Sequence, residues 1–346
     1  MSDRILIAVD GGNSKTDLVV VRSDGALLAH ARGPGCSPHH MGTDACVGLI
    51  GELLASARSQ AGVDGLRAAT AVLLIAGADL ESEEEELRGC AQRRDWAEQL
   101  VVGNDTLAVL RTGSDDCVGV AVTCGAGINA LGRAADGRRA RFPALGPITG
   151  DWGGGADLGL AALGRAVRAD DGRGRPTALA KLVPEHFSLH SAEDVALALH
   201  RHELDSERLV ELAPLVLDAA DAGDSSAIEL RERLAEEIVA FVRAAAGRVL
   251  EGVVRYDVVL GGSLLAHSKS LGELVIERLR TELPAADPHV PTLPPVVGSA
   301  LLGLDLMEAG AAAAERLRAA VLELTSTQGS KGSSKRRNLM TEVEAP

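Results

Sequence analysis

The sequence DGGNSKTD, at residues 10–17, decides how this chain folds. It follows RILIAV at residues 4–9, an apolar run typical of a buried strand. It leads into a second apolar run at residues 16–21, so Asp10–Ser14 predict a tight turn between two paired strands. A further turn at Ser23-Asp24-Gly25 precedes a third expected strand at residues 27–31. This strand-rich opening predicts the start of an α/β domain.

The same pattern begins again 113 positions later, with Thr123 in the place of Asp10. An apolar run at residues 118–122 leads into the glycine turn Thr123–Gly127, a return strand at 129–132 and a turn at Asp136-Gly137. We therefore predict an internal duplication of a unit that starts with a β-hairpin.

The remaining segments complete two α/β halves. We expect a helix at 43–61, a strand at 71–76, helical structure within 83–97 and a strand at 99–102. Residues 156–283 are expected to be mostly helical, interrupted by a strand at 257–263, with a linker at 291–295 and a last helix at 298–324. The predicted domains are 1–116 and 117–324, with the last helix able to pack back on the first domain, and 325–346 as a disordered tail.

Composition excludes several classes of protein. The 346 residues are enough for two domains, and 49 acidic against 35 basic side chains argue against a broad nucleic-acid surface. No run of about 20 apolar residues predicts a membrane span, and no secretory signal is visible, so we expect a cytoplasmic protein. The five cysteines are odd in number and lack a Cys-x-x-Cys pair, so we expect reduced thiols rather than disulfides or zinc.

The first hairpin turn has the chemistry of a phosphate site. Its glycines allow a close backbone approach to an anion, and Ser14, Lys15 and Thr16 add hydroxyl and ammonium donors. Asp10, at the end of a strand, could hold a hydrated Mg²⁺ ion. The spacing is not that of a Walker loop, and an ordinary hairpin turn is the alternative.

Three further motifs lie at positions that suit binding or catalysis. The turn with Gly125 and Gly127 matches the first hairpin and could clasp the same phosphates. The runs 261–263 and 298–303 place glycine and small residues at helix starts, which suits a nucleoside or simply a helix cap. Asp105, just past a strand in Gly103-Asn104-Asp105-Thr106, is placed either as a general base or as a helix N-cap.

The order of these motifs resembles the N-acetylglucosamine kinases of the BadF/BadG/BcrA/BcrD ATPase family, within the actin–sugar kinase–Hsp70 superfamily. The resemblance covers residues 4–310 and includes the segments 76–79 and 150–151. It implies an α/β protein with two ribonuclease-H-like (actin-like ATPase) domains flanking a nucleotide cleft.

The resemblance also implies a role for each matching residue. Asp105 is the implied catalytic base, and Asp10 the implied magnesium residue. The implied ATP-binding residues are Asp10, Gly11, Gly12, Ser14, Lys15, Thr16, Thr123, Gly125, Gly127, Asn129, Gly261, Gly262, Ser263, Gly298 and Ser299. The implied sugar-binding residues are Ser37, His39, Ala76, Gly77, Asp79, Asn104, Asp105, Gly146, Gly150 and Asp151.

The sequence departs from the family pattern in places that affect the substrate. Ala126 and Ile128 replace hydroxyl donors of the second hairpin, Ser37 replaces an asparagine, and Trp152 replaces a glutamate. The expected function is a Mg-ATP-dependent kinase that phosphorylates the 6-hydroxyl of N-acetylglucosamine or a related amino sugar, with a homodimer as the family's common state.

Four alternatives stay open at this point. The first is a kinase for glucosamine, N-acetylmuramic acid or glucose, and the second is a non-catalytic sugar or nucleotide sensor. An activator of radical dehydratases would need closely spaced cysteines for an iron–sulfur cluster, and a sugar-binding transcription regulator would need a helix-turn-helix extension. The sequence shows neither feature.

Overall fold

The computed structural model describes residues 4–324, so the expected tail at 325–346 lies outside the described residues. Within the described chain, the residues before Gly113 and those from Thr292 onward form one compact unit, and Gly113–Pro291 form a second. The boundaries expected from the sequence fell after residues 116 and 324. The structure thus includes the segment after residue 291 in the first unit rather than the second.

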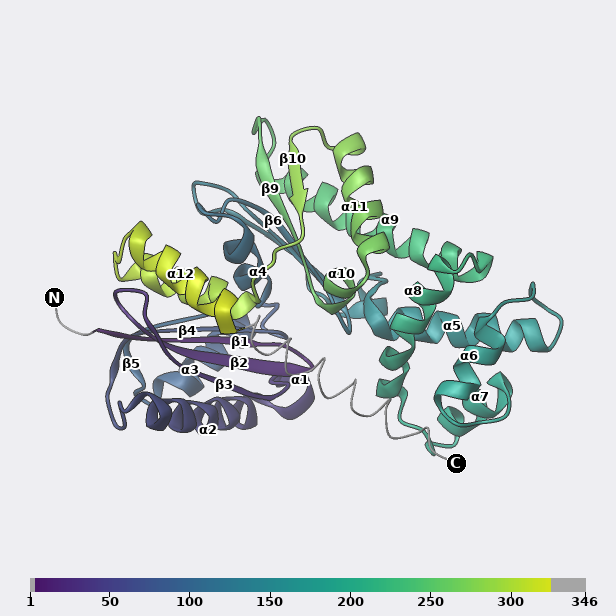
Figure 1. The fold of residues 1–346 in the computed structure, drawn as a ribbon, viewed down its shortest axis with the longest axis horizontal. Coiled ribbons are helices and arrows are strands. Elements are labelled where there is room, and N and C mark those ends of the chain that lie inside the picture. The colour runs from purple at the N-terminus through teal and green to yellow at the C-terminus, as the bar shows by residue number, and fades with distance from the viewer. Residues whose placement is uncertain (1–3, 325–346) are drawn as a thin grey trace, which may run out of the picture. The chain divides into compact units, whose positions relative to one another are not determined.

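The first unit is built on a five-stranded sheet in the order β3-β2-β1-β4-β5 (Figure 1). Strands β1 to β3 pair in antiparallel fashion, and β4 and β5 run parallel to β1. The predicted hairpin is confirmed, with Asp10 of β1 opposite Asp17 of β2. The strands are β1 (Ile5–Gly11), β2 (Lys15–Arg22), β3 (Leu27–Pro34), β4 (Ala68–Ile75) and β5 (Ala97–Gly103).

Helices cover this sheet because its central strands are apolar on both faces. β1 is buried along its whole length, as expected for a strand with parallel and antiparallel neighbours. Helix α2 packs on β2 and β3, α3 packs on β5, and α12 packs on β1, β2 and β4. The helices are α1 (Pro38–Met41), α2 (Thr43–Ala61), α3 (Glu81–Gln92), α4 (Thr106–Gly113), α12 (Pro295–Leu306) and a helix at 311–324.

The second unit repeats the sheet of the first. Its strand order is β10-β9-β6-β7-β8, in which β6, β7 and β8 form the antiparallel part and β9 and β10 the parallel part. Thr123 of β6 lies opposite Asn129 of β7, as Asp10 lies opposite Asp17. The predicted duplication is therefore confirmed. The strands are β6 (Gly119–Cys124), β7 (Ile128–Arg133), β8 (Arg139–Arg141), β9 (Tyr256–Gly261) and β10 (Ala286–His289).

The second unit differs from the first in a large helical insertion between β8 and β9. The long helix α9 lies along β6, β7 and β8, and α5 packs on α6, α7, α8 and α9 (Figure 1). Ala, Val and Leu dominate the buried core, as the scarcity of aromatic residues requires. The insertion contains η1 (Gly146–Ile148), α5 (Gly154–Asp170), α6 (Leu179–His186), α7 (Ala192–His200), η2 (Ser206–Leu212), α8 (Ala213–Asp221) and α9 (Ser225–Val249). Helices α10 (Ser263–His267) and α11 (Lys269–Glu282) follow β9.

The last predicted helix, 298–324, is in fact two helices. Helix α12 ends at Leu306, and the chain resumes a helix only at residue 311. Glu308 and Gly310 between them have φ angles of 54° and 80°. These left-handed conformations cannot continue a right-handed helix, so the Ala- and Leu-rich composition alone overestimated its length.

Helices α4 and α12 pack closely through Gly298. A Cβ atom at this position would lie 1.9 Å from the carbonyl oxygen of Ala108 and 2.5 Å from Oγ1 of Thr112. The buried guanidinium of Arg111 on α4 also donates to the carboxylate of Asp305 on α12, at 2.8 and 3.2 Å. Close helix packing therefore accounts for the glycine at 298.

The expectation of five reduced cysteines was wrong. Cys36 and Cys46 form a disulfide, and Cys90, Cys117 and Cys124 are free and buried. Cys36 follows β3 and Cys46 lies in the first turns of α2, so the intervening chain turns back and brings their Cα atoms to 5.2 Å. An odd cysteine count could not reveal this reversal of the chain.

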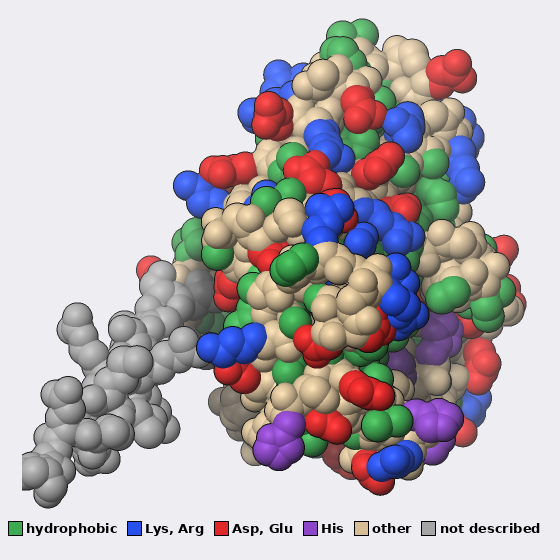
Figure 2. All heavy atoms as spheres, turned by 90° about the vertical axis from the view of Figure 1, so that its right-hand side faces the viewer, with side chains coloured by type: hydrophobic (Ala, Val, Ile, Leu, Met, Phe, Trp, Pro, Cys, Tyr) green, Lys and Arg blue, Asp and Glu red, His purple; other side chains and the backbone are tan. Residues whose placement is uncertain are grey.

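No described helix combines the length and apolar character needed to cross a membrane. Acidic and basic side chains are interspersed over the face drawn in Figure 2, with hydrophobic side chains between them.

Replacing Gly298 by alanine is expected to destabilise the first unit by about 1–3 kcal/mol, because the new methyl group meets a backbone oxygen that cannot move alone. Gly48→Ala in α2 is the matched control, since nothing lies within 4 Å of the added Cβ there. Urea unfolding followed by circular dichroism measures both variants. Equal stability of the two variants would contradict the packing role of Gly298.

Thiol titration tests the disulfide. Unreduced, denatured protein is expected to expose three reactive thiols, those of Cys90, Cys117 and Cys124, and reduction should raise the number to five. Five thiols before reduction would show that Cys36 and Cys46 are not bonded in the isolated protein.

Candidate active site

The tip of the β1–β2 turn is open to solvent. Asn13, Ser14 and Lys15 are exposed, and the N–H of Gly12 donates to the carbonyl of Lys15 at 2.9 Å. The N–H of Cys36 donates to the carbonyl of Gly12 at 3.0 Å, which ties the turn to the segment after β3. Ser14 and Lys15 are thus available to an anion, and their role toward phosphate stays a prediction.

Two of the residues expected to bind phosphate have close contacts within the fold. Thr16 is fully buried, and its hydroxyl donates to the carbonyl of Pro34 at 2.7 Å. Gly11 is buried against β4, where a Cβ atom would lie 2.7 Å from the side chain of Ile75. Neither residue therefore presents a side-chain donor to the exposed tip of the turn.

A cluster of cations surrounds Asp17 beside this turn. The Asp17 carboxylate is 1% exposed and lies 3.2 Å from Nζ of Lys15, 2.7 Å from Nε of Arg32 and 2.8 Å from Nε2 of His30. Burial opposes ionisation, but the hydrogen bonds from His30 and Arg32 and the charges of Lys15 and Arg32 outweigh it and lower the pKa of Asp17. Two permanent cations face one carboxylate, which leaves a positive charge suited to phosphate.

Asp10, at the end of β1, has the opposite character. Burial, followed by the charges of Asp105 and Asp17, raises its pKa to about 8. No hydrogen-bond donor to its carboxylate is found among residues 4–324. A buried carboxylate without a donor fits a residue that holds a hydrated cation, as the sequence predicted for Mg²⁺.

The turn after β4 brings several predicted sugar-binding residues together. The N–H of Ala76 donates to the carbonyl of Gly11 at 2.7 Å. Gly77 has a φ of 79°, and a Cβ atom there would lie 2.7 Å from Oγ of Ser37 and 3.3 Å from the ring of His39. Ser37 is buried, and its hydroxyl has no hydrogen-bond partner within the described chain.

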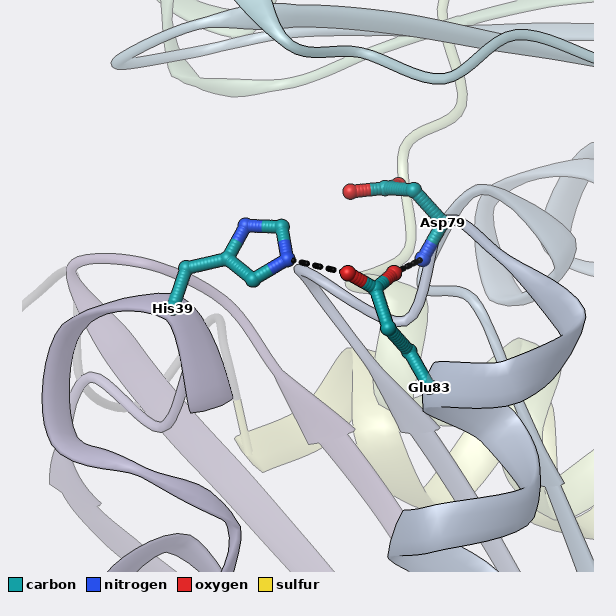
Figure 3. A group of neighbouring side chains, drawn as sticks. All are labelled: His39, Asp79 and Glu83. Carbon is teal, nitrogen blue, oxygen red and sulfur yellow. Dashed lines mark hydrogen bonds and ion pairs between the residues drawn. The ribbon is translucent and has the colours of Figure 1, made fainter.

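Asp79, which follows this turn, lies beside His39 and Glu83 (Figure 3). One potential ligand atom from each of the three side chains lies within 4.8 Å of the other two, a spacing that could hold a divalent cation. The Glu83 carboxylate, however, already accepts from the N–H of Asp79 at 2.9 Å and lies 2.8 Å from Nε2 of His39. The group is therefore stable as a hydrogen-bonded cluster of protein groups.

The end of β5 contributes Asn104 and Asp105. Nδ2 of Asn104 donates to Oδ1 of Asp79 at 2.7 Å, while its Oδ1 accepts from the N–H and hydroxyl of Thr106, the first residue of α4. Asn104 thus takes the side-chain capping bond that was one explanation for Asp105. Burial, and then the charge of Asp79, raises the pKa of Asp105 to about 7.

In the second unit, the β6–β7 turn and the turn after β9 meet. A Cβ atom on Gly262, whose φ is 95°, would lie 2.2 Å from the carbonyl oxygen of Cys124, and one on Gly125 would lie 3.6 Å from Oγ of Ser263. Gly127 closes the β6–β7 turn by accepting from the N–H of Gly125 at 2.9 Å. The residues of these two turns that were predicted to bind the nucleotide are thus neighbours: Thr123, Gly125, Gly127, Asn129, Gly261, Gly262 and Ser263.

Two side chains of this group differ in their hydrogen bonds. Asn129 accepts from the N–H of Ala130 at 2.7 Å. Thr123 differs, because its hydroxyl is buried with no hydrogen-bond partner in the described structure. Its expected role as a donor to phosphate, in place of the hydroxyls replaced by Ala126 and Ile128, stays a prediction.

The remaining predicted residues divide between the units. Gly146, Gly150 and Asp151 lie in the second unit, where Asp151 accepts from the hydroxyl of Thr149 at 2.5 Å. Next to Asp151, the indole of Trp152 lies 3.9 Å from the guanidinium carbon of Arg233, a cation–π contact. Gly298 and Ser299 lie in α12 of the first unit and are buried by packing, which does not favour the predicted adenosine contact.

Sequence reasoning missed His30, Arg32 and Glu83 of the first unit and the run Gly153-Gly154-Gly155 of the second. His30 and Arg32 alternate along β3, so a strand pattern places both on the face of Asp17. Glu83 stands within a run of glutamates and carried no distinctive signal. The run Gly153-Gly154-Gly155 supports the second hairpin, because the N–H of Gly155 donates to the carbonyl of Gly125 at 2.7 Å.

Comparison with known proteins relates this chain to sugar kinases. The chain is 25% identical over 320 residues to N-acetyl-D-glucosamine kinase of Dictyostelium discoideum, an alignment that covers 88% of this chain and 99% of the relative. It is 26% identical over 243 residues to N-acetylmuramic acid/N-acetylglucosamine kinase of Clostridium acetobutylicum, covering 70% of this chain and 79% of the relative.

Solved structures agree with the fold. A candidate N-acetylglucosamine kinase from Chromobacterium violaceum superimposes with a TM-score of 0.71 at 25% identity, covering 88% of this chain and all of that one. A glucokinase from Streptomyces griseus, solved with glucose and AMPPNP, has a TM-score of 0.54 at 19% identity, which supports the two-domain actin-like fold alone. Residues 7–303 match the family directly, and this chain therefore belongs to the BadF/BadG/BcrA/BcrD ATPase family.

Proposed function

We propose that this protein transfers the γ-phosphoryl group of ATP to the 6-hydroxyl of N-acetylglucosamine or a related amino sugar. The family and the two curated relatives support the coarser statement, an ATP-dependent sugar kinase of the N-acetylglucosamine and N-acetylmuramic acid type. The observation that carries the finer proposal is Asp105, a partly buried carboxylate with a pKa of about 7 beside Asp79 and Asn104.

Asp105 acts as the general base in this proposal. Its raised pKa suits a group that must be ionised before reaction and accept a proton during it. The acceptor hydroxyl loses its proton to Asp105 as its oxygen attacks the γ-phosphorus in line, and ADP departs with the bridging oxygen. Asn104, held by Asp79 and Thr106, fixes the backbone from which Asp105 extends.

Charge neutralisation is the other requirement of phosphoryl transfer, because the reacting group is strongly anionic. Lys15 and Arg32 provide positive charge next to the first turn. Asp10 would hold Mg²⁺, which supplies further neutralisation of the phosphates when it is bound. Thr123 and the backbone of the Gly125–Gly127 turn are proposed to donate to the phosphates from the second unit.

The direct test is ADP release with Mg-ATP and a panel of N-acetylglucosamine, N-acetylmuramic acid, glucosamine and glucose. We expect the N-acetylated sugars to stimulate ADP release most, and nuclear magnetic resonance of the product to show phosphate on the 6-oxygen. Measurable ATP binding without stimulation by any sugar would contradict the kinase proposal and favour a sensor.

The role of Asp105 predicts both a mutant phenotype and a pH profile. Asp105→Asn is expected to lower kcat by about 10²- to 10⁴-fold, since the amide cannot accept the proton. In the wild-type protein, kcat/KM for the sugar should rise with pH up to about 7, because the free enzyme must lose the Asp105 proton to gain its base.

Both measurements have a clear contrary outcome. Near-normal turnover of the Asn variant would rule out a base at this position. A kcat/KM that stays flat between pH 5 and pH 8 would show that no group with a pKa of about 7 must ionise. Steady-state kinetics with detection of ADP measures both the turnover of the Asn variant and the pH dependence of kcat/KM.

A further inference from the structure

Glu83 joins two segments of the candidate sugar site that lie far apart in the sequence. Its Oε2 accepts from the N–H groups of Asp79 and Leu80 at 2.9 and 2.8 Å. Its Oε1 lies 2.8 Å from Nε2 of His39, which is 44 residues away. Figure 3 shows the Glu83 carboxylate between the other two side chains.

Each segment held by Glu83 carries predicted sugar-binding groups. On one side, Asp79 accepts from Asn104, the neighbour of Asp105. On the other side, His39 and the unpartnered hydroxyl of Ser37 both lie close to the point that a Cβ atom on residue 77 would occupy. If the Glu83 carboxylate shifted, the predicted sugar-binding groups on both segments would therefore move with it.

We propose that Glu83 is a positioning residue for the sugar acceptor, which holds the Asp79 turn and His39 in the geometry that binds it. This inference rests on the proposed kinase function. Glu83 does not itself need to touch the sugar, because both of its oxygens are occupied by protein donors. Its role is thus distinct from that of Asp79 and His39.

Two simpler explanations for the contacts of Glu83 are a cation site and a helix cap. A cation site formed by His39, Asp79 and Glu83 would need the oxygens of Glu83 to give up their present donors. A pure helix cap needs only an acceptor for the N–H of Leu80, which glutamine supplies as well as glutamate. The link to His39 goes beyond capping, since it connects α1 to α3.

The electrostatics agree with a stable ionised carboxylate. Burial alone would favour its neutral form, but the contacts from His39 and from the backbone N–H groups of Leu80 and Asp79 lower the pKa of Glu83. The charge therefore strengthens the hydrogen bonds that hold the two segments.

The test compares Glu83→Ala, Glu83→Gln and a matched control, Glu85→Ala. Glu85 is on the same helix, is exposed, and lies outside the cluster. With the acceptor identified by the sugar panel, Glu83→Ala should raise its KM by about 10- to 100-fold, as expected for losing hydrogen bonds to a charged group. KM for ATP should change by less than about twofold, kcat should fall by a smaller factor than the acceptor KM rises, and Glu83→Gln should recover part of the loss.

A double-variant cycle tests the connection to His39. If Glu83 acts partly through His39, the acceptor KM of the variant carrying both Glu83→Ala and His39→Ala should rise by less than the product of the two single effects. Multiplied effects of the two substitutions would show independent roles and overturn the connection. An unchanged acceptor KM in Glu83→Ala, with the wild-type protein active, would overturn the whole inference.

Hydrogen exchange provides a readout that does not depend on catalysis. The N–H groups of Asp79 and Leu80 should exchange faster in Glu83→Ala than in Glu85→Ala, whether or not any sugar is phosphorylated. Faster exchange with no sugar kinase activity in the wild type would reject the proposed function but keep the structural role of Glu83. Unchanged exchange would reject that role directly.

Discussion

The candidate site depends on one constraint of the first sheet, the parallel direction of β1, β4 and β5. Because the carboxyl ends of neighbouring parallel strands reach the same edge of a sheet, the residues that follow them gather there. Here those residues include Asp10, Asp79 and Asp105. The pKa values of Asp10 and Asp105 rise to about 8 and 7, with burial as the main cause and neighbouring acids adding to it. Burying carboxylates with raised pKa values does not stabilise the fold, so this group of residues indicates a functional site.

The parts of the fold that were predictable from the sequence are those set by local patterns. The hairpin around residues 10–17 follows from two apolar runs and a glycine turn, and its copy at Thr123–Gly127 follows from the same pattern. Helix α2 was predicted at residues 43–61 and begins and ends there. The gathering of Asp10 and Asp105 required only the strand ends and the resemblance to the family.

The parts that were not predictable depend on contacts between distant segments. Strand β10 is only four residues long and pairs with β9, so its short sequence gave no periodic signal. Gly298 suited a nucleotide-binding turn as well as a helix contact, and only the carbonyl of Ala108 distinguishes the two. Glu83 is one glutamate among several in α3, and its side-chain partner His39 lies 44 residues before it in the chain.

Asp10 and Asp17 pair in register in the first hairpin, but their pKa values are shifted in opposite directions. This difference separates their proposed roles. Asp17 is held ionised by Arg32, His30 and Lys15, and in the proposed function the remaining charge of these cations attracts phosphate. Asp10 favours its neutral form, and the ionised forms of Asp10 and Asp105 oppose each other. A cation bound beside Asp10 would stabilise its charge and remove that opposition. In the proposed mechanism, ionisation of Asp105 is therefore easiest after the positive charge has arrived, which favours a site that becomes fully reactive only once the nucleotide and its cation are bound.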